Sequence, residues 1–327
     1  MSILTPHRTP AAAIRVDGWD FGDFPYGLEP LAMPPAGRAQ AGTEHRPVTL
    51  PSCDPDRIAR ELRALTGSGP GAAALVDAAP ASSYDQLFWF RWIVGHQVTF
   101  ALWRLMGRVL EEVGEKGPDA VPGPGAMARL ECYAHGYSAM LLYSGSCPTA
   151  LYQRLIRPAM FLQHRGFSGT WAPDFHQVRS LLRGRPLPWT DDPRAAGVVA
   201  ALGAQRAVHD SVAARLVPGG RSLLQQSINE APVKPSERTA VLYDNFFMTL
   251  RGPVPDEAVA AQLVRRLRAV GLDLAVNGLY PLGRDDDGEE AEVWNGSLAR
   301  SERRVGVVLA EAAGFAADLA RRAPAAV

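Results

Sequence analysis

The chain has 327 residues with 47% apolar content, enough to form one large hydrophobic core or two smaller ones. Its 34 basic side chains balance its 34 acidic side chains, so no basic excess points to nucleic acid as a partner. No stretch approaches the roughly 18 consecutive apolar residues that a membrane span needs. The composition therefore argues against a nucleic-acid-binding or membrane-spanning protein.

The N-terminus and the cysteines favour the cytoplasm. Residues 1–10 contain two prolines, a histidine and an arginine, and they lack the apolar segment of a secretory signal. The three cysteines, Cys53, Cys132 and Cys147, are odd in number and do not have metal-ligand spacing. This pattern is typical of reduced thiols, so we expect a cytoplasmic protein.

In chain order, residues 1–52 come first, and their prolines, glycines and scattered aromatic side chains predict an irregular arm. The pattern then becomes helical, beginning with Asp54 as a candidate cap for a helix that Gly67 ends. The longest candidate helix begins near Ser82–Ser83 and ends near Val113. Further helices are predicted at about 125–142, 148–164, 174–183, 192–216, 235–250, 256–270 and 295–322. The prediction is an all-α protein, with one helical domain over residues 53–327.

The longest predicted helix carries the most informative cluster. Five of its side chains recur at steps of three or four residues and share one face: Trp89, Trp92, His96, Thr99 and Trp103. A histidine in such a helix is either a hydrogen-bonded core residue or part of a site walled by flat aromatic rings. The residues alone leave both readings open.

A second histidine, His209, follows Arg206 by about one helical turn and precedes a loop that contains Gly219 and Gly220. It is either a surface histidine between charged neighbours or an axial metal ligand whose second ring nitrogen bonds an acceptor. The chain has no HExxH or CxxC motif, so zinc chemistry has no support.

Three short motifs on the long helix resemble the distal helix of histidine-ligated haem oxygenases typified by tryptophan 2,3-dioxygenase: Leu87-Phe88, His96-Gln97 and Leu102-Trp103-Arg104. Arg206, three residues before His209, is similar to that family's proximal element. The stretch Gly219-Gly220-Arg221-Ser222 is similar to its glycine-rich lid loop. The resemblance covers roughly residues 80–225 and implies the all-α dioxygenase fold.

Departures from the dioxygenase pattern point to another branch. The gap from His96 to Trp103 is one residue longer than in the dioxygenases, and their Ser-Gly-Phe-Gln-Ser stretch has no clear copy. Residues 156–171 and Val178-Arg179 resemble instead the bacterial haem-dependent L-tyrosine hydroxylases, which make L-DOPA for antibiotic biosynthesis. A methyltyrosine-hydroxylating relative attaches its haem covalently through a His-x-x-x-Cys pattern. This chain lacks that pattern, so the resemblance implies non-covalent haem b.

The resemblance also implies residue roles. His209 would be the axial ligand of the haem iron, and His96 would be the catalytic group on the other side. Trp89, Trp92, Trp103 and Arg206 would bind the cofactor. The candidates for binding the substrate are Arg165, Arg154, Ser168, Gly220 and Ser222, with the two arginines as possible partners of a carboxylate. The expected reaction is hydroxylation of L-tyrosine to L-DOPA with hydrogen peroxide or dioxygen, in a homodimer.

Three alternatives stay open at this stage. One is a haem dioxygenase that opens the indole ring of tryptophan or a derivative. Another is a helical haem-binding protein without turnover. The third is a haem-free helical interaction protein in which His96 is a core residue and His209 a surface residue.

Overall fold

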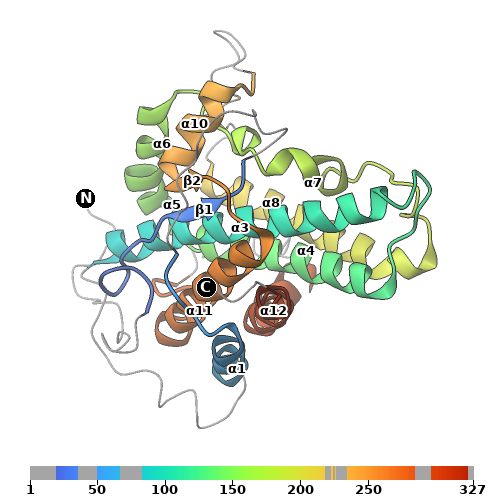
Figure 1. The fold of residues 1–327 in the computed structure, drawn as a ribbon. Helices are drawn as coiled ribbons and strands as arrows, with labels where there is room; N and C mark the ends of the chain where they lie inside the picture. Colours follow the sequence, from blue (N-terminus) through green and yellow to red (C-terminus); the bar gives the residue numbers. More distant parts are fainter. Residues whose placement is uncertain are drawn as a thin grey trace.

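The computed structural model describes residues 20–35, 50–66, 83–217, 222–223, 225, 234–283 and 296–322, and these are mostly helical (Figure 1). This confirms the predicted all-α class. In the described part the only sheet is a parallel pair of three-residue strands, β1 (Leu31–Met33) and β2 (Thr249–Arg251), with Leu31 opposite Thr249. None of the described helices is long and apolar enough to cross a membrane.

Most helices agree closely with those expected from the sequence, but the one expected over 235–250 ends at Phe246, before strand β2. Their bounds are α1 Pro55–Thr66, α3 Tyr84–Gly114, α4 Pro124–Gly145, α5 Thr149–Leu151, α6 Arg157–Gln163, α7 Phe175–Leu182, α8 Ala196–Leu216, α10 Glu237–Phe246, α11 Asp256–Asn277 and α12 Gly296–Ala320. Helix α3 begins where Ser83 Oγ accepts a hydrogen bond from the backbone N–H of Gln86 at 3.2 Å. It is apolar on every side, and most residues between Leu87 and Val109 are buried.

The single helix expected over 148–164 is interrupted. A π-helical turn, Tyr152–Ile156, separates α5 from α6. Pro158 explains the break, because it has no N–H to donate to the carbonyl one turn earlier, and the wider turn precedes it. Helix α11 in turn continues past the expected end near residue 270. Gly271 lies inside it, where an added Cβ would come within 2.5 Å of Leu62 of α1, so this glycine permits close helix packing.

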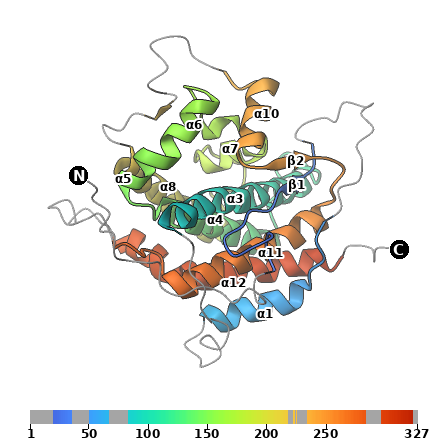
Figure 2. The same cartoon turned by 90° about the vertical axis from the view of Figure 1, so that its left-hand side faces the viewer.

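Helix α3 lies at the centre of the molecule. Figure 2 shows α1, α11 and α12 together along one side of it, and α6, α7 and α10 on the opposite side. Helix α4 packs against α3 and α8, which completes the framework around the centre. The described part of the N-terminal arm packs on this body, because the rings of Phe21 and Tyr26 meet the edge of Phe90 with centroids 6.2 and 5.4 Å apart.

A buried ion pair fixes α3 against its neighbours. Arg91 of α3 and Asp273 of α11 are both fully buried, and Arg91 Nε lies 2.7 Å from Asp273 Oδ2. The Tyr143 hydroxyl of α4 donates to the same carboxylate at 2.7 Å, and the Tyr26 hydroxyl of the arm donates to it at 3.4 Å. The network therefore joins the arm to α3, α4 and α11. Arg91 is the residue that precedes Trp92 on α3.

Candidate functional site

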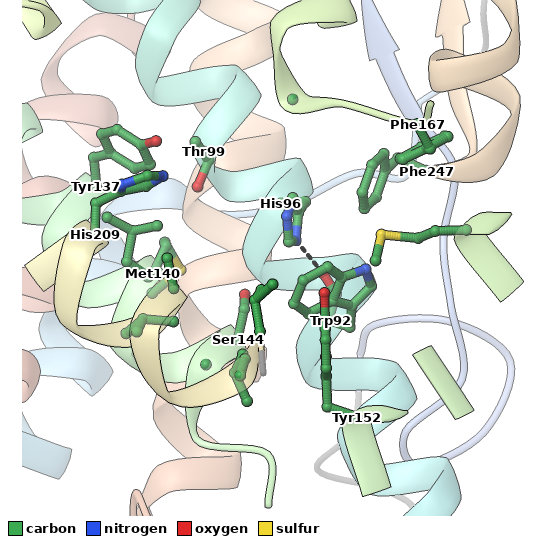
Figure 3. Close-up of a pocket in the computed structure, with 18 of the residues that line it drawn as sticks. Trp92, His96, Thr99, Tyr137, Met140, Ser144, Tyr152, Phe167, His209 and Phe247 are labelled. Carbon is green, nitrogen blue, oxygen red and sulfur yellow. Dashed lines mark hydrogen bonds between the residues drawn. The ribbon is translucent and has the colours of Figure 1, made fainter. Parts of the chain in front are cut away.

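A cavity of about 260 Å³ lies beside the centre of α3, slightly below the range of about 300–1,000 Å³ that is usual for small-molecule sites. Its walls are mainly apolar and aromatic (Figure 3). The main lining side chains are Trp92, His96, Thr99 and Trp103 from α3, Tyr137, Met140, Leu141 and Ser144 from α4, His209, Val212, Ala213 and Leu216 from α8, and Tyr152, Met160, Phe167, Tyr243 and Phe247. Segments far apart in the sequence thus form one aromatic chamber.

His96 is held from three sides. Its Nδ1 lies 2.7 Å from the carbonyl oxygen of Trp92, which can only accept, so Nδ1 carries the proton and Nε2 is free to accept one. The Phe247 ring stacks on the imidazole at 4.5 Å with an interplanar angle of 17°, and the Trp92 ring lies 4.4 Å away. Burial lowers the pKa of His96 to about 4, although the bond to the Trp92 carbonyl opposes that shift. At neutral pH His96 is therefore an uncharged acceptor.

His209 lines the same cavity from α8 (Figure 3). Its side chain is 54% exposed, and its Nδ1 lies 3.2 Å from Asp210 Oδ1. A carboxylate on one ring nitrogen orients an imidazole so that the other nitrogen can bind a metal. The structure therefore brings to one cavity the two histidines that the sequence singled out, although they are more than a hundred residues apart in the chain.

The predicted cofactor-binding tryptophans separate into two groups. Trp92 and Trp103 line the cavity, and the Nε1–H of each is buried with no hydrogen-bond partner among the described residues. Trp89 does not line the cavity, because it packs edge-on against Phe246 with ring centroids 5.8 Å apart. The predicted Arg206 is exposed, and its guanidinium lies beside Gly184.

The predicted substrate-binding residues that the structure describes do not line the cavity. Arg154 is exposed and forms a two-point ion pair with Asp85 at 3.0 and 2.5 Å. Arg165 is exposed as well. Ser168 caps the short turn Gly169–Trp171, and Ser222 is bonded to Gln225. Gly220 lies outside the described residues. Substrate binding by these residues stays a prediction.

The structure adds cavity residues that sequence patterns did not indicate. Tyr137, Tyr243 and Phe247 reach the chamber from α4 and the end of α10. Tyr152 reaches it from the π-helical turn, and its hydroxyl is hydrogen-bonded to the guanidinium of Arg157. Only the π-helical turn has a local signal, namely Pro158 within an otherwise helical pattern. The other side chains meet through tertiary packing.

Comparison with protein families gives one match. Residues 41–198 match the model of the family described as SfmD 3-methyl-L-tyrosine peroxygenase. This part of the chain is SfmD-like. The match confirms the resemblance to haem-dependent oxygenases that act on aromatic amino acids. It covers just under half of the chain, includes His96 and ends before His209. A comparison with curated proteins finds no significant match.

Proposed function

We propose that this protein is a haem-dependent peroxygenase that hydroxylates the ring of L-tyrosine, or of a ring-substituted tyrosine, next to the phenol oxygen. One observation carries the proposal: His96 and His209 line a single aromatic cavity in a chain whose residues 41–198 are SfmD-like. The oxidant that this family name favours is hydrogen peroxide. One oxygen atom of peroxide would enter the ring, and the other would leave as water with the displaced hydrogen.

The side chains that line the cavity are of the types that could hold a haem with one protein ligand. No three His, Cys, Asp or Glu side chains of the described part form a cluster that could hold a metal ion by themselves. A haem iron needs only one imidazole from the protein, and we assign it to His209, oriented by Asp210. Val212, Ala213 and Leu216 on the same helix give the apolar wall that a flat macrocycle requires. The two buried indole N–H groups are donors that a bound ligand could satisfy. When bound, the haem would supply the oxidising chemistry.

His96 would hold the reacting hydroxyl in place. A phenol has a pKa near 10 and enters the site protonated at neutral pH. The unprotonated Nε2 of His96 can accept a hydrogen bond from the phenol or from peroxide, because Nδ1 carries the ring proton. Since the pKa of His96 is about 4, the imidazole stays uncharged until the reaction gives it a proton. Trp92 and Tyr152, whose rings lie 5.6 Å apart, would exclude water from the part of the cavity around His96.

The amino-acid carboxylate needs a cation near the aromatic chamber. Arg154 and Arg165 are the candidates from the sequence, and the structure adds Arg157, which bonds the hydroxyl of the lining residue Tyr152. An arginine fork matches carboxylate geometry and could bind it at two points. Replacing Arg157 by Lys should therefore raise KM for the amino acid while leaving the phenol chemistry in place.

Two substrates can be ranked by experiment. The motifs of the chain resemble the L-tyrosine hydroxylases, whereas the family model is that of a 3-methyl-L-tyrosine peroxygenase. A competition assay would supply the haem-loaded protein with both amino acids and ¹⁸O-labelled peroxide, and mass spectrometry would measure each product. We expect catechol products that carry the label, with L-tyrosine preferred and with L-phenylalanine unreactive.

The matched control is His96→Gln, which keeps a hydrogen-bonding side chain but lacks the imidazole. We expect it to bind haem and to lose most of the catechol product. A formylkynurenine product from tryptophan would show instead that the protein is an indole-opening dioxygenase. Haem binding with no product from any aromatic amino acid would favour a non-catalytic haem protein.

A further inference from the structure

The ring of Phe247 has a defined place on His96, but its backbone belongs to a corner between α10 and β2. At this corner Met248 has a positive φ of 53°, a conformation that residues other than glycine rarely adopt. The Met248 carbonyl accepts a hydrogen bond from the backbone N–H of Leu31 in β1 at 2.9 Å. Something must keep this uncommon corner in place if the ring is to stay flat on the imidazole.

Gln97, which follows His96 on α3, bonds the corner directly. Its side chain is fully buried, and its Nε2 donates to the Phe247 carbonyl at 2.9 Å and to the Glu29 carbonyl of the arm at 3.1 Å. Two consecutive residues of α3 therefore contact the same phenylalanine. His96 contacts the ring, and Gln97 contacts the backbone.

The amide of Gln97 is itself fixed by a buried arginine. Arg266 Nε of α11 donates to Gln97 Oε1 at 3.0 Å, which leaves the Gln97 amide nitrogen directed at its two carbonyl acceptors. The other nitrogen atoms of Arg266 donate to the carbonyls of Pro30 at 2.8 Å and Gln262 at 3.3 Å. Because both partners are fully buried, either one left unsatisfied would cost free energy.

We infer that Gln97 is a positioning residue for His96: by holding the Phe247 carbonyl, it keeps the Phe247 ring stacked on the imidazole and so fixes the direction of Nε2. The stacking itself is independent of the proposed peroxygenase function. Only its value for catalysis rests on that function. The hydrogen bond between Nδ1 and Trp92 restrains one edge of the imidazole, and the ring of Phe247 restrains its face.

The test measures the stack in the full-length chain without added haem. An aromatic ring over an imidazole shifts the imidazole proton resonances upfield, so ¹³C-histidine NMR reports the contact directly, with His96→Gln to assign the signal. We expect Gln97→Met, which is similar in size but has no amide donor, to lose most of the upfield shift. Phe247→Leu gives the reference value without the ring.

A second variant distinguishes the loss of the Gln97–Phe247 hydrogen bond from a general loss of folding. Gln97→Glu keeps an acceptor for Arg266 but cannot donate to the Phe247 carbonyl, and it should lose the shift as Gln97→Met does. Strand β2 should stay folded in both variants, because Arg251 also bonds Asp174 and Asp244 at distances between 2.8 and 3.0 Å, and none of these bonds reaches Phe247.

The matched control is Gln262→Met. Gln262 is a buried glutamine whose amide bonds the N–H and carbonyl of Ala32, both at 2.8 Å, so it also ties the arm to α11 but has no bond to Phe247. We expect the wild-type shift in this variant. Retention of the shift in both Gln97 variants would overturn the inference. Its loss in Gln262→Met as well would show that the arm as a whole, and not Gln97, positions the ring.

Discussion

Replacing His96 by glutamine should make the fold less sensitive to acid. The pKa of His96 is about 4 in the folded protein and 6.5 without its surroundings, because burial disfavours the charged imidazole. Between these values only the unfolded chain binds the proton, so the wild-type free energy of unfolding falls as the pH falls. Above pH 6.5 the imidazole is neutral in both the folded and the unfolded chain, so this loss of stability is absent. By pH 4 the free energy of unfolding has fallen by roughly 3 kcal/mol, since a shift of one pKa unit corresponds to about 1.4 kcal/mol.

Urea unfolding across this pH interval measures the effect. The wild-type protein should lose up to about 3 kcal/mol more than His96→Gln on acidification, because glutamine does not titrate. The exposed His176, replaced in the same way, serves as the control and should follow the wild type. Equal losses in the wild type and in His96→Gln would refute the conclusion that His96 is a desolvated, neutral imidazole.

Other substitutions test the surroundings of the site. Asp273→Asn should cost about 3–5 kcal/mol in urea unfolding, because it leaves the fully buried Arg91 without its ionic partner. Gly95→Ala should cost about 1–3 kcal/mol, since the new Cβ would come within 2.1 Å of Ser144 Oγ, and adding Ser144→Ala should recover most of that loss. Arg154→Ala should change the free energy of unfolding by less than about 1 kcal/mol in the same urea assay, because its ion pair with Asp85 is exposed.

The helices could be predicted from the sequence because their signals are local. Helix α3 begins next to Ser83, close to the expected start, and α12 lies within the expected range 295–322. The exceptions have physical reasons as well. The helix expected over about 256–270 continues through Gly271, which serves close packing against Leu62, and Pro158 converts one expected helix into two with a π-helical turn between them.

The two histidines could be found from their helical context, and the family resemblance implied one common site for them, but no local pattern in the sequence could indicate their shared cavity. His96 and His209 line the same cavity because α3 and α8 both pack against α4, and no local pattern specifies this packing. Phe247 was missed for the same reason, since its place on His96 depends on a corner held by α3 and β1. Arg154 is a candidate carboxylate partner from the sequence, and the fold adds that it pairs with Asp85 on the surface, which no local pattern indicated.

Haem titration of the purified protein decides whether His209 binds the iron. We expect one haem per chain with a sharp Soret band, a marked loss of affinity in His209→Gly, and recovery when free imidazole fills the space of the missing side chain. His176→Gly should bind haem like the wild type. If His209→Gly binds haem with wild-type affinity and an unchanged spectrum, His209 is not the iron ligand and the proposed site is wrong.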